Sequence, residues 1–171
     1  MPAPRYLALV GGFIKNIVAS VVGGTPFTIV STGSDGFIDR SYLKDQVTKS
    51  MVASENIAAG DQVNIWDDAG TPKLRKADAS GGLAKKSDGY APAAILSGAS
   101  GLIVSGQEIN TAVAGLTPVA DYFLSATVPG GVAKATDPGY PTTAGHISQF
   151  IGKSTAAAEL MQIIDQPIEL A

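Results

Sequence analysis

The sequence contains no cysteine and only one histidine, His146. Without thiols the chain cannot form disulfides, cysteine-ligated zinc sites, thiol nucleophiles or iron–sulfur clusters. A single imidazole also excludes metal sites that need two histidine ligands and proton relays that need a pair of histidines. The side chains that most often carry metal and redox chemistry are therefore almost absent.

Charged and aromatic residues are also scarce, at 16% and 6% of the chain. The 12 basic and 15 acidic residues give a net charge of -3, so the chain lacks the basic surface that displaces counterions from nucleic acids. Small residues are abundant, because 25 alanines and 20 glycines make up 45 of the 171 residues. Because many of its apolar side chains are small, we expect the protein to bury part of its apolar surface against other copies or partners.

Long apolar runs are limited to residues 6–14. Lys15 interrupts the approach to the small residues at which a signal peptide would be cleaved, so we expect no cleavage. Lys15 and the glycine pairs at 11–12 and 23–24 also break up the roughly 20 apolar residues that a transmembrane helix needs. We expect no membrane contact and interpret this segment as an apolar arm that docks on another protein.

The charge pattern divides the chain near residue 50. Residues 1–50 carry five basic and three acidic side chains, a net charge of +2, whereas residues 51–171 carry seven and twelve, a net charge of -5. The first part has β-forming residues at 27–30 and a short extended segment at 37–43, but no core of its own. We expect residues 1–50 to form an extended N-terminal arm and connector, and residues 51–171 to form a β domain.

Turn residues recur at short intervals after residue 51, and short apolar runs lie between them. These runs are residues 62–66, 101–104, 121–126, 147–151 and 160–164. The pattern predicts a mainly β fold, a small antiparallel β-barrel or sandwich with an extended N-terminal arm. Helical periodicity is weak, and the best helix candidate, residues 154–160, spans at most two turns.

Residues 121–151 repeat the sequence pattern of residues 61–96, at an offset of about 60 residues, and we call this similarity the sequence echo. Each stretch begins with an aspartate and a β-forming run, turns through glycine into a second strand, and reaches an apolar strand. Two such hairpin-plus-strand units would form the halves of one small barrel. Chance similarity between short β segments is the alternative, because a hairpin specifies little sequence.

Candidate catalytic residues are few. His146 and Ser148 accompany several aspartates, but no nucleophile elbow is present, so we interpret His146 as a polar residue at the entry of a strand. Asp67 and Asp68 follow Trp66, but adjacent strand residues point to opposite sides and cannot flank one glycosidic bond. We interpret them as part of a hairpin turn. No glycine-rich phosphate loop occurs, and we predict no catalytic, metal or cofactor site.

We interpret the aromatic and basic residues of the β domain as structural rather than as parts of a binding site. We expect the aromatic side chains on strands to pack against the fold, namely Trp66, Tyr90, Tyr122 and Phe123. The one basic cluster is interspersed with aspartates, which predicts a mixed solvated face rather than a nucleic-acid patch. Its members are Lys73, Arg75, Lys76, Lys85 and Lys86.

Several stretches resemble a pattern found in structural proteins of tailed bacteriophages. Residues 115–132 contain G-L-T-P, Y-F-L-S and V-P-G-G-V, residues 149–152 read Q-F-I-G, and residues 167–170 read P-I-E-L. These are similar to a strand pair, a following strand and a closing strand of such proteins. Residues 34–43 are similar to a connector near the start of these chains. The resemblance departs at Val119, where a glycine is usual.

Similar modules occur in head decoration (cement) proteins and in head or tail fibre proteins. The chain is short for a fibre and lacks coiled-coil heptads and collagen-like repeats, which favours a decoration protein. The resemblance implies a non-enzymatic virion protein on the surface of the phage head that binds the major capsid protein. It also implies a homo-oligomer, with a trimer favoured and a dimer as the other possibility.

On this interpretation the apolar arm crosses neighbouring subunits. Its expected anchors are Leu7, Leu9, Phe13, Ile14, Ile17 and Val18. The alternative function is a receptor- or glycan-binding module of a phage head or tail fibre, in which Trp66 and nearby loops contact sugar.

Overall fold

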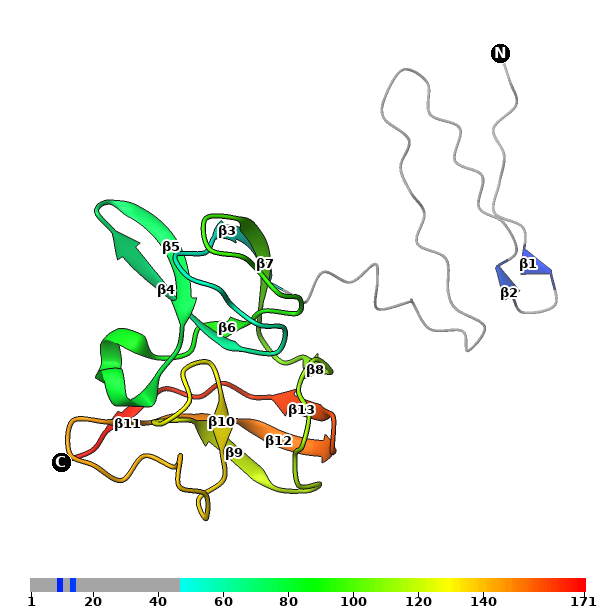
Figure 1. The fold of residues 1–171 in the computed structure, drawn as a ribbon. Helices are drawn as coiled ribbons and strands as arrows, with labels where there is room; N and C mark the ends of the chain where they lie inside the picture. The colour runs from blue at the N-terminus through cyan, green and yellow to red at the C-terminus, as the bar shows by residue number, and fades with distance from the viewer. Residues whose placement is uncertain (1–8, 11–12, 15–46) are drawn as a thin grey trace. The chain divides into compact units, whose positions relative to one another are not determined.

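The computed structural model describes residues 9–10, 13–14 and 47–171 (Figure 1). The chain divides into two compact units, Met1–Lys44 and Asp45–Ala171. In the first unit β1 (Leu9–Val10) pairs with β2 (Phe13–Ile14) as an antiparallel hairpin, with Leu9 opposite Ile14 and Val10 opposite Phe13. The segments expected at 27–30 and 37–43 lie outside the described residues.

The second unit begins with a five-stranded antiparallel sheet in the order β3-β7-β6-β4-β5. Because β3 begins at Val47, residues 47–50 belong to this sheet, although the sequence placed them in the arm. A 3-10 segment, η2 (Ala79–Lys85), follows β5. The strands are β3 (Val47–Val52), β4 (Gln62–Asp68), β5 (Thr71–Lys76), β6 (Gly89–Tyr90) and β7 (Ser100–Ser105).

A second five-stranded antiparallel sheet, in the order β10-β9-β12-β13-β8, lies below the first in Figure 1. A short ladder joins β11 (Ile147–Ser148) to β14 (Ile168–Glu169) near the C-terminus. The strands of the second sheet are β8 (Ile109–Asn110), β9 (Asp121–Leu124), β10 (Val132–Ala133), β12 (Phe150–Ala156) and β13 (Glu159–Gln162).

The two sheets share one connectivity. Numbered in chain order within its own sheet, each has its strands in the order 1-5-4-2-3. The hairpins that the sequence echo paired, β4–β5 and β9–β10, occupy equivalent places. A positive-φ residue also stands two positions before each first hairpin strand, Gly60 (φ 87°) before β4 and Val119 (φ 62°) before β9. This repeated order supports an internal duplication more strongly than the sequence echo does.

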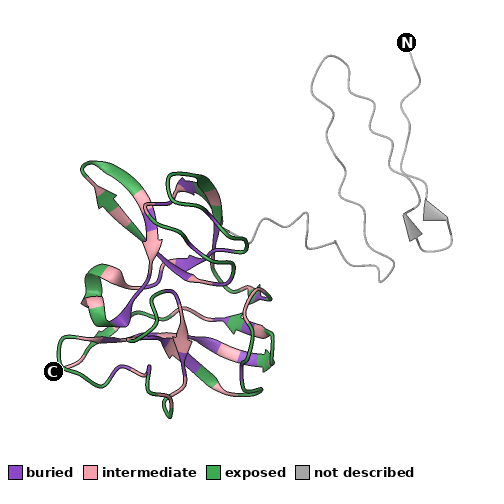
Figure 2. Cartoon of the chain, viewed as in Figure 1, coloured by how far each residue is buried: buried purple, intermediate pink, exposed green. Residues whose placement is uncertain are grey.

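Each sheet has its own hydrophobic core, and buried residues follow the strands in both halves (Figure 2). The first core contains Val63, Leu74 and Ile103, and the second contains Leu124, Ile151 and Leu160, all at most 1% exposed. The expected mainly β, antiparallel fold is therefore confirmed. Among the described residues the sheets are sandwich-like and do not close into the barrel that the sequence also allowed.

The short helix expected at residues 154–160 is wrong. Ser154 to Ala156 end β12, Ala157 and Ala158 form a turn, and β13 begins at Glu159. Ser154 pairs with Leu160 across this hairpin, and both are buried. A two-turn helix has few hydrogen bonds of its own, so pairing with neighbouring strands overrides the local helix preference of three alanines.

Val119 adopts a backbone conformation that suits glycine. A β-branched residue at positive φ is strained, and this side chain is 72% exposed, so it gains little from burial. Val119→Gly should therefore raise the free energy of unfolding by about 1 kcal/mol, measured by urea denaturation. Val128→Gly is the matched control, since Val128 is exposed without positive φ and should lose about 0.5–1 kcal/mol. A less stable Val119→Gly variant would contradict the assigned strain.

Candidate functional site

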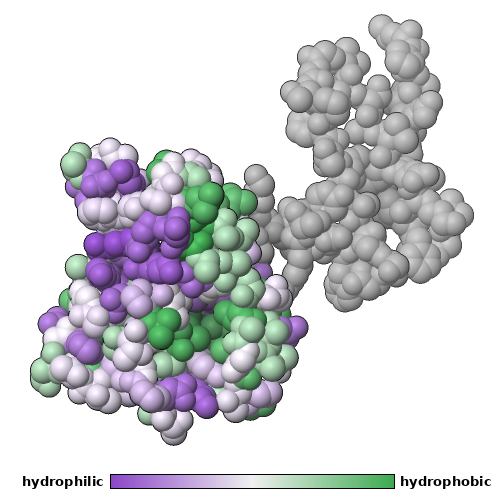
Figure 3. Space-filling model, in the orientation of Figure 1, coloured by the Kyte–Doolittle hydropathy of each residue, from purple (hydrophilic) through white to green (hydrophobic). Residues whose placement is uncertain are grey.

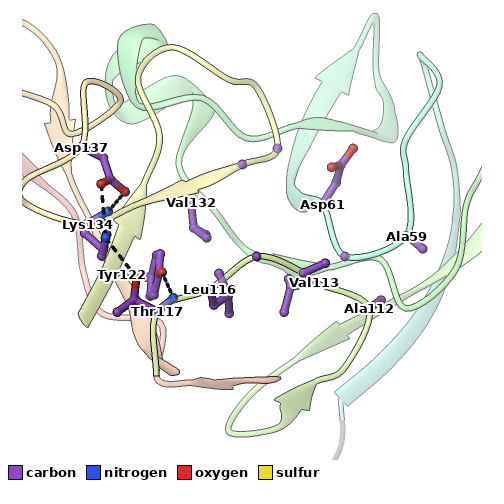
Figure 4. Close-up of a pocket in the computed structure, with 15 residues that line it drawn as sticks. Ala59, Asp61, Ala112, Val113, Leu116, Thr117, Tyr122, Val132, Lys134 and Asp137 are labelled. Carbon is purple, nitrogen blue, oxygen red and sulfur yellow. Dashed lines mark hydrogen bonds and ion pairs between the residues drawn. The ribbon is translucent and has the colours of Figure 1, made fainter. Parts of the chain in front are cut away.

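An open cavity of about 500 Å³ lies where three loops of the second unit meet (Figure 4). The loops contribute residues 59–61, 112–117 and 130–137, which precede β4, follow β8 and surround β10. Ligand pockets commonly have volumes of about 300–1,000 Å³, so this cavity has room for a cluster of large side chains. We call it the loop groove.

The floor of the loop groove contains aliphatic side chains. Val113 and Val132 are partly buried against the second core, and Leu116 belongs to that core. Figure 4 shows Val132, Leu116 and Val113 between Asp61 on one side and the Lys134–Asp137 pair on the other. Leu116 is almost fully buried, and polar atoms make up more of the exposed lining than apolar atoms do.

Backbone contacts hold the groove loops in place. The Thr117 amide donates to the Tyr122 hydroxyl at 2.8 Å, and the Asn110 side-chain amide donates to the Gly60 carbonyl at 3.1 Å. A Cβ atom on Gly60 would lie 2.6 Å from the Ala112 carbonyl oxygen. Close approach of the two loops therefore requires glycine at this position.

The groove also joins the two sheets. The Gln62 amide donates to the Gly130 carbonyl and the Gly130 amide donates to the Ala77 carbonyl, both at 2.7 Å. A Cβ on Gly130 would lie 2.7 Å from the Asp61 carboxyl carbon. The glycine turn between β9 and β10 is thus anchored to both ends of the β4–β5 hairpin.

Charged groups of the groove take part in ion pairs. Asp61 lies 3.3 Å from the Lys76 ammonium, and Asp137 lies 3.5 Å from that of Lys134. Lys134 also donates to the Thr117 hydroxyl at 3.1 Å. These groups are arranged for structure and for a polar rim, and the lining contributes two carboxylates and one ammonium.

Large apolar side chains are also exposed on the sheets. Ile109 and Met161 are cross-strand partners and are 49% and 38% exposed, and Leu102 on β7 is 54% exposed. Figure 3 shows apolar surface near β8 and β10 and beside β3 and β7, whereas hydrophilic side chains gather over β4, β5 and η2. Exposed apolar surface of this kind is available for protein contacts.

A smaller pocket of about 350 Å³ is lined in part by Gln149. The buried side-chain amide of this residue holds two backbone segments together, and we call it the amide clamp. The Gln149 side chain accepts from the Ser87 amide at 2.7 Å and donates to the Ser87 and Asp165 carbonyls at 3.0 and 3.1 Å. The Ser87 hydroxyl donates to Gln62 at 2.9 Å. This network ties the segment after η2 to β12 and to the C-terminal residues, so we assign it to stability.

The expected aromatic residues lie on strands. Trp66 on β4 stacks against the Arg75 guanidinium, 4.9 Å from the ring centroid, and its indole N–H donates to the Ser54 hydroxyl at 3.2 Å. Arg75 therefore covers one face of the indole, and the glycan-binding alternative stays a prediction. Burial raises the pKa of Tyr90 on β6, and the Glu108 carboxylate raises it further.

The expected hairpin turn at Asp67 and Asp68 is present. These residues end β4, and Ala69 and Gly70 form a two-residue turn with φ angles of 52° and 86°. Positive φ at both positions is typical of the hairpin turn that matches strand twist. Asp68 pairs with Lys73 at 2.5 Å, so the carboxylate braces the hairpin.

The basic cluster forms a mixed face, as its sequence indicates. Lys76, Lys85 and Lys86 each lie within 3.8 Å of an aspartate carboxylate, as Lys73 also does. Arg75 is held instead by hydrogen bonds to Asn64 at 2.8 Å and to the Ala84 carbonyl at 2.6 Å. The positive charges are thus largely compensated by their neighbours.

His146 lies directly before β11, and its Nδ1 atom is buried without a hydrogen-bond partner among the described residues. Ser148 lies on β11. In the part of the chain that the structure describes, no group of three or more His, Asp or Glu residues could hold a metal ion. Across residues 47–171 and the two short strands, no helix is long and apolar enough to cross a membrane.

Three of the six expected arm anchors belong to the β1–β2 hairpin, namely Leu9, Phe13 and Ile14. Leu7, Ile17 and Val18 lie outside the described residues. The sequence analysis did not predict the loop groove, because its lining comes from three loops that are distant in the chain. The glycines at 130–131 were the available signal, although they predicted only a turn.

We call the stretches that resemble phage structural proteins, residues 34–43, 115–132, 149–152 and 167–170, the virion-like stretches. Residues 115–132 and 149–152 contribute strands to the second sheet, and residues 167–170 contain β14 of the β11–β14 ladder. Residues 34–43 lie outside the described residues. Tyr122 and Leu124 on β9 point into the second core, residues 129–131 form the β9–β10 turn, and Gln149 to Gly152 begin β12. No family model matches the sequence, and no curated protein or solved structure matches it either. The resemblance therefore depends on these stretches alone.

Proposed function

We propose that this chain is a structural protein of a tailed-phage head, a decoration protein that binds the major capsid protein and stabilises the shell. One observation carries the proposal: the two-sheet unit leaves large apolar side chains exposed on β7, β8 and β13, namely Leu102, Ile109 and Met161. The apolar N-terminal residues belong to a separate unit, Met1–Lys44. Exposed apolar side chains on the two-sheet unit are available for burial against other protein chains.

The virion-like stretches and the exposed apolar side chains support the same proposal. A decoration protein needs a rigid module and surfaces that contact neighbouring chains, and repetition over a symmetric shell multiplies weak contacts. The two-sheet unit supplies the module. Leu102, Ile109 and Met161 supply apolar contact surface, and the N-terminal segment supplies a flanking apolar stretch.

Binding to purified heads that lack this protein tests the proposal. Deletion of residues 1–24 should reduce co-sedimentation with heads about 100-fold or more, because an apolar segment with several large anchors is removed. Circular dichroism of the truncated protein should still show the β spectrum of the second unit. The control variant Leu83→Asp changes a half-exposed side chain on η2 and should bind heads normally.

Two outcomes would count against the proposal. Undiminished binding by the truncated protein would overturn the role of the N-terminal segment. If the intact protein fails to bind heads but binds immobilised glycans, the fibre alternative replaces the decoration function.

A further inference from the structure

We infer that two copies of this chain join at β8, the edge strand of the second sheet, by antiparallel pairing of β8 with β8 of the second copy. The two-fold axis passes beside Ile109, so that this residue lies opposite its own counterpart. The inference goes beyond the proposed function, because it names a surface and its partner and concerns the protein in the absence of heads.

β8 lacks the features that protect the edge strands of the first sheet. An edge strand presents unpaired backbone groups to other strands, and soluble proteins commonly protect such edges with lysine or proline. In the first sheet, the edge strand β3 carries Lys49, and the edge strand β5 carries Pro72 and Lys73. β8 instead consists of Ile109, which is 49% exposed, and the buried Asn110. This edge is therefore suited to pairing with another strand.

The register of β8 on β13 shows where its backbone groups point. The Gln162 amide donates to the Glu108 carbonyl at 2.8 Å, and Ile109 lies opposite Met161. Hydrogen-bonded and non-hydrogen-bonded pairs alternate along an antiparallel ladder, so Ile109 directs its N–H and C=O away from β13. Within the described part of the chain no strand pairs with β8 on that side. Two copies of Ile109 facing each other can therefore exchange both hydrogen bonds.

The side chains of this edge are complementary to themselves. Residues directly opposite each other in an antiparallel pair lie on the same face of the sheet, so the two Ile109 side chains would be in contact. Met161, the neighbour of Ile109 on β13, is 38% exposed. The paired edges would thus join the exposed apolar side chains of two copies into one stripe across a continuous sheet. Such a stripe remains on the outer face, where the proposed function needs apolar contact surface.

The charges favour β8 over β5 as the site of self-pairing. Glu108 is the only charged residue in residues 105–113. With Ile109 opposite its counterpart, Glu108 lies opposite Asn110 of the second copy, so the two carboxylates do not face each other. β5 carries three cations in six residues, and its self-pairing would bring like charges close together, which destabilises a strand pair.

Charge substitution at Ile109 tests the pairing in the full chain. Ile109→Lys and Ile109→Glu each place like charges opposite each other in the dimer, and each should weaken self-association about tenfold or more. An equimolar mixture of the two variants places opposite charges together and should restore the dimer. Light scattering over a dilution series measures the molar mass, and circular dichroism should show the wild-type β spectrum. The control Ile168→Lys changes a 70% exposed isoleucine on β14 and should leave the molar mass unchanged.

Several results would overturn the inference. A wild-type chain that stays monomeric over the dilution series, or that forms a trimer, would contradict a two-fold pair. Wild-type molar masses for both Ile109 variants would place the contact elsewhere. If both variants dissociate but their mixture does not associate, β8 pairs with a different strand and the second-copy assignment is wrong.

A cysteine at Ile109 gives an independent readout, because the chain has no other thiol. Cα atoms of a hydrogen-bonded antiparallel pair lie about 5.5 Å apart, within the range that a disulfide spans. Mild oxidation should therefore link Ile109→Cys into a covalent dimer at least about fivefold faster than Ile168→Cys, although Ile168 is the more exposed. Equal rates would contradict the inference. These experiments contain no heads, so their failure leaves the proposed function in place, and loss of head binding with intact pairing removes only that function.

Discussion

Gly152→Ala should lower the free energy of unfolding by about 3 kcal/mol, since overpacking a closely packed interior forces backbone shifts. Gly152 lies on the central strand β12, paired with Gln162 on β13 and with Tyr122 on β9. A Cβ atom at this position would collide with the Met161 carbonyl oxygen. That oxygen belongs to the backbone of a paired strand, so it cannot rotate away as a side chain can.

Urea denaturation of the full chain measures this effect. Gly81→Ala is the matched control, because its new methyl group would meet only the flexible Lys85 side chain. We expect the control to change stability by less than about 1 kcal/mol. A Gly152→Ala variant as stable as the control would contradict this prediction. It would mean that β12 and β13 can move apart at little cost in free energy, so that their close approach at Gly152 does not contribute to stability.

Most strands could be predicted because their residues alternate or form short apolar runs between turns. The run at 62–66 lies in β4, the run at 101–104 lies in β7, and the first four residues of the run at 121–126 form β9. Ala69 and Gly70 were recognisable as a hairpin turn from their neighbours. These features are local, so the sequence of a few residues determines them.

Features that depend on distant residues could not be predicted. Residues 154–160 look helical because of three adjacent alanines, yet Leu160 is required in the second core. The shared strand order of the sheets appears only once β3 and β8 are paired with β7 and β13. The loop groove likewise exists only where three separate loops meet.

The virion-like stretch at 149–152 has a structural explanation at two of its four residues. Gly152 permits the close approach of β12 and β13, and Gln149 clamps two backbone segments. Such residues specify a fold and not a binding partner. The resemblance therefore bears on the fold of the module, whereas contacts with another protein depend on its exposed apolar side chains.

Gln149→Met should lower the free energy of unfolding by about 2–4 kcal/mol, because it leaves buried backbone groups without partners. The Gln149 amide makes three hydrogen bonds, to the Ser87 N–H, the Ser87 carbonyl and the Asp165 carbonyl. Methionine has a similar shape, so the packing of this buried site is largely kept. The loss then reports the hydrogen bonds rather than a cavity.

Gln162→Met is the matched control for this clamp. Gln162 is fully buried like Gln149, but neither its Nε2 nor its Oε1 atom has a hydrogen-bond partner within the described part of the chain. Replacing a buried amide that makes no hydrogen bonds by an apolar side chain should keep or raise stability. A difference of at least about 2 kcal/mol between the two variants in urea denaturation would confirm the clamp. Equal losses would mean that any buried glutamine in this unit tolerates methionine equally poorly, which would remove the special role of Gln149.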